Sequence, residues 1–175
     1  MIIDSFSFAS VDRKERHIVK VNKIIINKEQ QELDIVGVTL LSVEEAAKLS
    51  LEIRNIDDWW WLCSPGILQC EATLVSHEIV DYAGHDVDEA NGVRPALQIS
   101  NLGDSNLKEG DKFKWGDYTW TIISDQYALC DKCVALLPFR EDSEAKDANV
   151  YEKSDIKKYL DQWYEDKKDN ELLHQ

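Results

Sequence analysis

Residues 59–66 read WWWLCSPG and residues 92–97 read GVRPAL, and these two blocks decide the fold. Three consecutive tryptophans are rare in a soluble chain unless the rings are packed, because each ring can bury about 150–250 Å². Pro65-Gly66 then ends the run with a turn dipeptide. The two blocks mark the beginning and the end of one structural unit, so we expect them to anchor the middle of the core.

Hydrophobic spacing outside the two blocks predicts both helices and strands. Helices are expected at residues 11–21, from the capping box at residues 42–45 to about Ile53, and after Ser154. Strands are expected within 22–38, within 72–99 on either side of a loop at 81–91, around the Gly116-Asp117 turn, and in a hairpin over 128–137. Residues 140–149 are expected to be a polar loop, and the charged tail from Lys167 is expected to fray. This mixture predicts one α+β domain, residues 1–175, with a mainly antiparallel sheet and three or so helices. A bound zinc would stabilise this fold.

The two blocks resemble the signature of a domain family of unknown function from low-GC Gram-positive bacteria and their phages, WWLRSPG followed by GVRPAL. Cys63 stands where the family has arginine. Two further family motifs resemble residues 110–120, GDKFKWGDYTW, and residues 151–160, YEKSDIKKYL, with Lys157 and Tyr159 in place of arginine and tryptophan. In the family these motifs precede the tryptophan block, whereas here they follow it. The resemblance therefore implies a rotated order, in which residues 1–100 match the family's second half, residues 107–166 match its first half, and residues 101–109 join them.

The chain is strongly acidic, with 34 acidic and 20 basic residues and a formal net charge of −14. Nucleic acid would be repelled, because affinity for it comes mainly from neutralising phosphates. The charge fits either ordinary solubility or attraction to a basic protein surface. We expect a partner to meet acidic side chains in two predicted loops: Asp81, Asp86, Asp88, Glu89, Glu141, Asp142 and Glu144. The start of the chain lacks the pattern of a signal peptide and no segment is long enough to span a membrane, so we expect a cytoplasmic protein.

Four cysteines form two sequence pairs, Cys63 with Cys70 and Cys130 with Cys133. Paired cysteines in a cytosolic chain favour metal over a disulfide, and four thiolates would hold a closed structural zinc. His77 and His85 are the fallback ligands. Reduced buried thiols and a redox or disulfide pair are the alternatives, because a single CxxC is weak evidence for a metal.

The sequence contains no motif that assembles an active site. There is no phosphate-binding glycine loop, no HExxH and no GxSxG. Asp57 and Asp58 are expected to be solvated residues that directly precede the tryptophans. Arg94 is expected to form a buried structural ion pair rather than to bind a ligand. We therefore expect a protein that is not an enzyme.

Two functions of different classes follow. The first is a phage- or prophage-encoded inhibitor that acts in the host cytoplasm, resembles the type II anti-CRISPR class, and blocks DNA loading by docking on a basic surface of Cas9. The second is a protein- or glycan-recognition module on a lectin-like scaffold. A redox enzyme that uses Cys130 and Cys133 is a third reading, which would need an exposed thiolate of low pKa.

Overall fold

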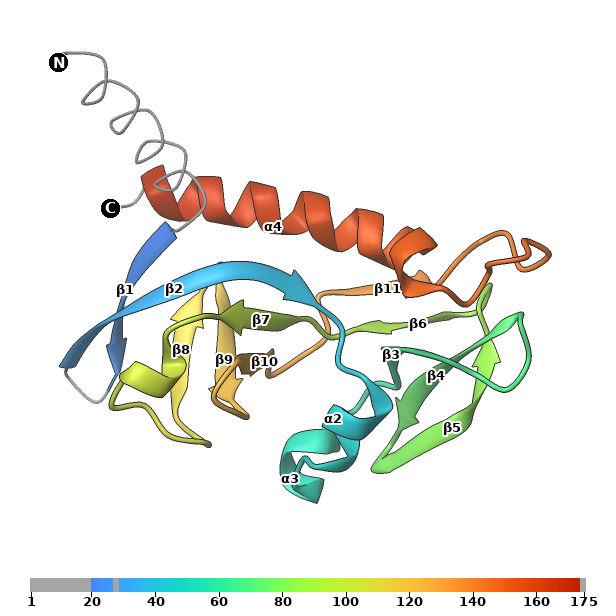
Figure 1. Cartoon of the computed structure of the whole chain (residues 1–175), viewed down its shortest axis with the longest axis horizontal. Helices are drawn as coiled ribbons and strands as arrows, with labels where there is room; N and C mark the ends of the chain where they lie inside the picture. Colours follow the sequence, from blue (N-terminus) through green and yellow to red (C-terminus); the bar gives the residue numbers. More distant parts are fainter. Residues whose placement is uncertain (1–19, 27–28, 174–175) are drawn as a thin grey trace, which may run out of the picture.

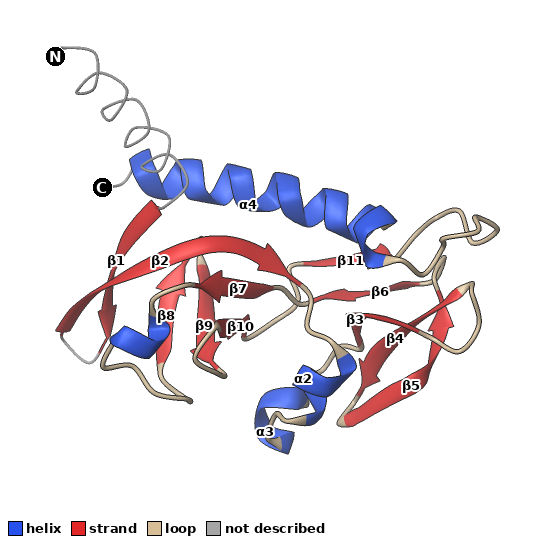
Figure 2. Ribbon diagram, in the orientation of Figure 1, coloured by secondary structure: helices blue, strands red, loops and turns tan. Residues whose placement is uncertain are grey.

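The structure is a computed structural model that describes residues 20–26 and 29–173, with side-chain surroundings from residue 32 to residue 169. It is a single α+β domain in which the described strands form two sheets and one long helix lies across both (Figures 1 and 2). Three α-helices are present in this part of the chain. The predicted fold class is therefore confirmed, with two sheets where the sequence indicated one.

The larger sheet has six strands in the order β1-β2-β7-β10-β9-β8, all paired antiparallel. Its strands are β1 (Lys20–Ile26), β2 (Glu29–Thr39), β7 (Ala96–Ile99), β8 (Lys112–Trp115), β9 (Tyr118–Ile122) and β10 (Tyr127–Cys130). The predicted hairpin at Gly116-Asp117 joins β8 to β9. Both residues have positive φ, 62° and 67°, which is the conformation that a two-residue type I′ turn requires.

The smaller sheet has five strands in the order β11-β6-β3-β4-β5. They are β3 (Trp60–Pro65), β4 (Glu71–Ser76), β5 (Ile79–Asp86), β6 (Ala90–Val93) and β11 (Ala135–Pro138). All pairs are antiparallel except β3 with β6, which are parallel at Trp60 and Gly92. The two sequence blocks therefore meet directly, as expected.

The tryptophan block is a strand with both faces buried. Trp61 packs in a core cluster that extends to Trp120 and to the long helix, whereas Trp60 and Leu62 pack in a second cluster with α2. Successive side chains of a strand point to opposite faces, so a strand covered on both sides needs an unbroken apolar run. This double burial explains why three tryptophans stand together.

The helices begin at side chains that cap them. α2 (Val43–Ala47) starts at Ser42, whose hydroxyl accepts from the Glu45 amide while the Glu45 carboxylate accepts from the Ser42 amide. Ser50 caps a separate helix, α3 (Leu51–Arg54), so the single predicted helix is two short ones. Two 3₁₀ turns, η1 (Leu102–Asp104) and η2 (Tyr151–Lys153), precede β8 and the last helix.

The last helix, α4 (Asp155–Leu173), lies across both sheets (Figure 1). Ser154 caps it by accepting from the Lys157 amide at 3.0 Å, as predicted. Ile156, Leu160 and Trp163 pack in the large core, where Trp163 meets the rings of Trp115 and Trp120 at 6.3 and 6.2 Å. The helix continues past Lys167 to Leu173, and fraying of this charged end stays a prediction.

The second block carries the chain from one sheet to the other. β6 lies in the five-stranded sheet and β7 in the six-stranded sheet, so Arg94-Pro95 is the crossing point. Residues 131–134 make the reverse crossing beside it, from β10 to β11. The two crossings are hydrogen-bonded, from the Cys130 amide to the Pro95 carbonyl at 2.9 Å and from the Val134 amide to the Val93 carbonyl at 2.8 Å. We call these two segments, 94–95 and 131–134, the crossover.

Several predicted elements differ from the structure. The hairpin over 128–137 is wrong, because β10 and β11 belong to different sheets. The loop at 81–91 is also wrong, since β5 extends to Asp86 and β6 begins at Ala90. Within 22–38, two strands replace one, while the polar loop at 140–149 is confirmed. The helix predicted at 11–21 lies outside the described residues apart from its last two, which belong to β1.

No helix in the described part of the chain is both long and apolar enough to cross a lipid bilayer.

Candidate functional site

Three loops come together at one end of the five-stranded sheet (Figure 1). They are residues 66–70 between β3 and β4, residues 86–89 at the β5–β6 turn, and residues 140–150 before η2. We call this surface the loop end. It gathers six of the seven predicted partner-binding residues, although those residues lie in sequence segments more than fifty positions apart.

Hydrogen bonds hold the three loops against one another. The Arg140 amide donates to the Val87 carbonyl at 2.9 Å, which joins the second loop to the third. The Asn149 side chain donates to the Leu68 carbonyl at 3.1 Å, and the Gln69 amide nitrogen donates to the Lys146 carbonyl. Because these bonds connect segments far apart in the sequence, the loop end has a defined shape supported by the sheet.

Apolar side chains stand exposed among these loops. Ile67 is 79% exposed, Leu68 56% and Val150 43%. Exposed apolar groups that gather within a polar surround mark surfaces that bind a partner, whereas isolated ones carry no such meaning. The loops that carry Leu68 and Val150 lie against each other, because the Leu68 carbonyl accepts from the side chain of Asn149, the neighbour of Val150 in the sequence.

The loop end is strongly acidic. Residues 66–70, 86–89 and 140–150 contain seven acidic and two basic side chains. One of the two bases, Arg140, forms an ion pair with Asp147 at 2.8 Å. The predicted partner-binding residues found here are all exposed: Asp86, Asp88, Glu89, Glu141, Asp142 and Glu144.

Asp81 lies outside the three loops of the loop end and has a local structural role. It lies within β5, where its carboxylate accepts from the amides of Ala83 and Gly84, both at 3.1 Å. The same carboxylate contacts the His85 ring at 3.1 Å. Its hydrogen bonds are therefore made within β5, and its link to the other six acids runs through the His85 ring, which also lies 3.7 Å from the Glu89 carboxylate.

Trp59 is the partly exposed member of the tryptophan run. Its ring is 38% exposed, whereas those of Trp60 and Trp61 are fully buried. It meets the rings of His77 and His85 edge-on, with centroids 5.8 and 5.3 Å apart. The two histidines lie on the β4–β5 hairpin and are the residues that the sequence offered as fallback metal ligands.

The cysteines do not form a metal site in the structure. Across the described residues there is no group of three or more His, Cys, Asp or Glu side chains able to hold a metal ion. Cys130 is buried, and Cys63, Cys70 and Cys133 are half-buried. Burial raises the pKa of Cys63 and Cys130 to about 11 and that of Cys133 to about 12.

This burial fits reduced thiols that act as small apolar groups better than it fits a redox pair, because a reactive thiolate requires a low pKa. The four-cysteine zinc site stays a prediction without support from the arrangement of these side chains. Native mass spectrometry of freshly purified, reduced protein tests it, since a metal-free mass would remove the zinc.

Arg94 is buried, as the sequence indicated, and it holds the crossover together. Its exposed fraction is 2%, and its Nε and Nη1 donate to the carbonyls of Cys130 and Ile53 at 2.7 and 2.8 Å. Its guanidinium also lies over the Trp60 ring, 4.8 Å from the centroid. Backbone carbonyls and an aromatic face therefore replace the ion pair expected for this residue, among the contacts found in the described chain.

Comparison with models of known protein families gave no match, and comparisons with curated proteins and with solved structures gave none either. The resemblance to the WWLRSPG family and the rotated order stay predictions that rest on the motifs themselves.

The sequence missed the apolar part of the loop end. Ile67 and Leu68 directly follow the Pro65-Gly66 turn, where polar residues are usual. Two apolar residues directly after a turn are the feature of the sequence that could have indicated this exposed apolar surface. The buried Arg94 and the acids were identified, but their neighbours depend on long-range pairing.

Proposed function

We propose that this protein is a recognition module that binds a basic protein surface through the loop end. The observation that carries the proposal is the combination at one place of exposed Ile67, Leu68 and Val150 with seven acidic side chains. Protein interfaces commonly place an apolar centre inside a polar rim.

Charge and apolar area would act at different stages of binding. The acidic rim would attract a positive surface over a distance set by the Debye length, about 8 Å at physiological ionic strength. It would therefore raise the association rate and select partners by the sign of their charge. The apolar centre would then be buried in the complex and slow dissociation, since buried anchors dominate binding energy.

Cas9 is the partner to test first. Its nucleic-acid channels are positively charged because they hold a heteroduplex by its backbone. A small protein with a net charge of −14 is repelled by nucleic acid and attracted by the same channel. Occupation of that channel would block DNA loading without any catalytic step by this protein.

The test compares two variants that have the same net charge. The first, Asp88→Asn with Glu141→Gln and Glu144→Gln, removes three exposed charges from the loop end. The second removes three exposed charges elsewhere, with Asp104→Asn, Glu109→Gln and Asp125→Asn. Affinity for guide-loaded Cas9 is measured by surface plasmon resonance at low and high salt, together with DNA cleavage.

The expected result is a loss of about tenfold in affinity for the loop-end variant, mainly in the association rate, and little change for the control. Three rim charges at a few tenths to 1 kcal/mol each give about that factor. Absence of binding by the wild-type protein rejects Cas9 as the partner. Equal weakening by both variants would mean that net charge, not the loop end, drives association.

A second pair of variants tests the apolar centre. Ile67→Ser with Leu68→Ser should abolish slow dissociation, whereas Leu51→Ser with Ile79→Ser should not. The control residues are also exposed, 58% and 62%, but lie away from the loop end. All four side chains are too exposed for the changes to cost much folding energy.

Glycan recognition is the second candidate, and the exposure of Trp59 favours it. A partly exposed ring flanked by polar His77 and His85 offers a stacking surface for a sugar. A glycan array tests this function: a saturable signal that Trp59→Ala removes would support it, and a signal that survives the substitution would reject this site.

A further inference from the structure

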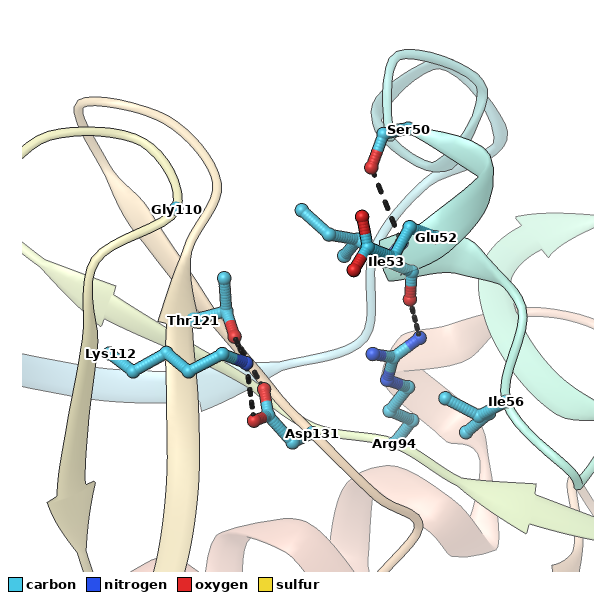
Figure 3. Close-up of a pocket in the computed structure, with 9 residues that line it drawn as sticks. All are labelled: Ser50, Glu52, Ile53, Ile56, Arg94, Gly110, Lys112, Thr121 and Asp131. Carbon is cyan, nitrogen blue, oxygen red and sulfur yellow. Dashed lines mark hydrogen bonds and ion pairs between the residues drawn. The ribbon is translucent and has the colours of Figure 1, made fainter.

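A pocket of about 360 Å³ lies beside the crossover, away from the loop end (Figure 3). One wall is α3 and the residues after it, with Glu52, Ile53 and Ile56. The other wall is the β8–β9 hairpin with Lys112 and Thr121. Arg94 stands between the walls (Figure 3). The volume is at the small end of the range for ligand pockets, about 300–1,000 Å³.

Arg94 offers one guanidinium nitrogen to this pocket. Nε and Nη1 donate to the carbonyls of Cys130 and Ile53, which leaves Nη2. In Figure 3 the terminal guanidinium nitrogen without a dashed line points toward the wall that carries Lys112. The hydrogen bonds that fix the rest of the group also fix the direction of this nitrogen.

The Arg94 charge has no carboxylate partner among the ion pairs of residues 32–169. A buried cation without a counter-ion is costly, and backbone carbonyls offset only part of that cost. A carboxylate that enters the pocket would supply the missing counter-charge and accept from Nη2. Hydrogen bonds between ionised groups are among the strongest in proteins.

The opposite wall is already neutral. Lys112 Nζ donates to Asp131 Oδ2 and to Thr121 Oγ1, both at 2.7 Å. The net positive charge available to a ligand is therefore that of Arg94. Glu52 adds an exposed negative charge on the α3 wall. A dianionic phosphate would face both carboxylates, so the pocket favours a single carboxylate.

We propose that this pocket binds a free α-amino acid with an apolar side chain. Its carboxylate accepts from Arg94, its ammonium group lies toward Glu52, and its side chain contacts Ile53 and Ile56. The pocket thus presents one cation, one accessible carboxylate and an apolar wall, which are the three features that such a zwitterion requires. The site is independent of the proposed protein-recognition surface.

The experiment uses four probes with the full-length protein and isothermal titration calorimetry. L-Leucine should bind with a dissociation constant on the order of 1 mM or tighter, as expected for so few atoms. L-Leucinamide lacks the carboxylate and should not bind. 4-Methylpentanoate lacks the ammonium group and should bind more weakly, and inorganic phosphate should not compete.

Glu52→Gln is the variant that leaves folding intact, because the side chain is exposed. It should weaken L-leucine about tenfold and leave 4-methylpentanoate unchanged. Arg94→Met should abolish binding of both, with circular dichroism as the check that it folds. The proposal is overturned if L-leucine does not bind, if leucinamide binds equally well, if phosphate competes, or if Glu52→Gln leaves leucine binding unchanged.

Discussion

Gly92→Ala is the sharpest test of how the two sequence blocks are joined. The Gly92 amide donates to the Trp59 carbonyl at 2.8 Å, next to the parallel pair of Gly92 with Trp60. A Cβ added to Gly92 would stand 2.6 Å from that carbonyl oxygen and against Cys133 Sγ. The sulfur belongs to a side chain that can rotate, but the carbonyl belongs to Trp59, directly before β3, and cannot move without disturbing the pair of Trp60 with Gly92.

The cost can be worked from these contacts. Overpacking in a filled core costs about 1–3 kcal/mol, and the lost hydrogen bond costs about 1 kcal/mol. The expected destabilisation is therefore about 2–4 kcal/mol, against a typical total of about 5–15 kcal/mol. With a urea m-value of about 2 kcal/mol/M, the unfolding midpoint should fall by about 1–2 M.

The assay is urea unfolding followed by tryptophan fluorescence, since Trp60 and Trp61 are fully buried. Gly103→Ala is the matched control, because a Cβ at Gly103 meets nothing within 4 Å. That change should alter stability by no more than about 0.5–1 kcal/mol. Cys133→Ala in the Gly92→Ala background should restore only the part of the loss that the sulfur causes. Equal midpoints for Gly92→Ala and Gly103→Ala would refute the close approach of the two blocks.

Three further predictions concern the cap, the thiols and the alkaline limit. Ser42→Ala removes the hydroxyl of the capping box and should lower the free energy of unfolding by about 1 kcal/mol in the same urea assay; no change would contradict the cap. Cys63, Cys130 and Cys133 should resist iodoacetamide in the native protein at pH 8 and react fully in urea, as mass spectrometry would show; fast labelling of Cys130 in the native state would instead favour the redox role. Folding raises these three pKa values above the ordinary 9.0, to about 11, 11 and 12, so the unfolded chain releases its thiol protons first as the pH rises. The free energy of unfolding should therefore be retained below pH 9 and fall between pH 9 and pH 12. Cysteine-to-alanine variants should show a smaller fall, and an unchanged slope would contradict this origin.

The sequence predicted the elements that local chemistry determines. The turn at Gly116-Asp117 requires two residues that tolerate positive φ, and Ser42 with Glu45 forms a complete capping box. Both features depend on residues within a few positions of one another. The burial of the WWWLCSPG rings in the core also followed from composition, since three adjacent tryptophans need packing partners, but their place in a strand did not.

The elements that it missed depend on distant partners. Cys130-Asp131-Lys132-Cys133 has the spacing of a tight turn, but β11 pairs with β6, more than forty residues earlier, so the segment crosses between sheets. Similarly, Asp81 and His85 are polar because β5 is an edge strand with one exposed side, not because they lie in a loop. Local composition does not distinguish an exposed edge strand from a loop.

The candidate site divides in the same way. The acidic residues were identifiable one by one, because charge is a property of the sequence. Their gathering around Ile67 and Leu68 depends on how residues 140–150 fold back on the β3–β4 loop. The pocket at Arg94 likewise exists only because the two crossing segments run side by side.

Amide hydrogen exchange of the protein alone and bound to guide-loaded Cas9 tests the central claim most directly. Binding through the loop end predicts slower exchange at residues 66–70, 86–89 and 140–150, with residues 110–131 unchanged. Slower exchange confined to other surfaces, or a complex that leaves these three loops unprotected, would contradict the claim that the loop end is the recognition surface.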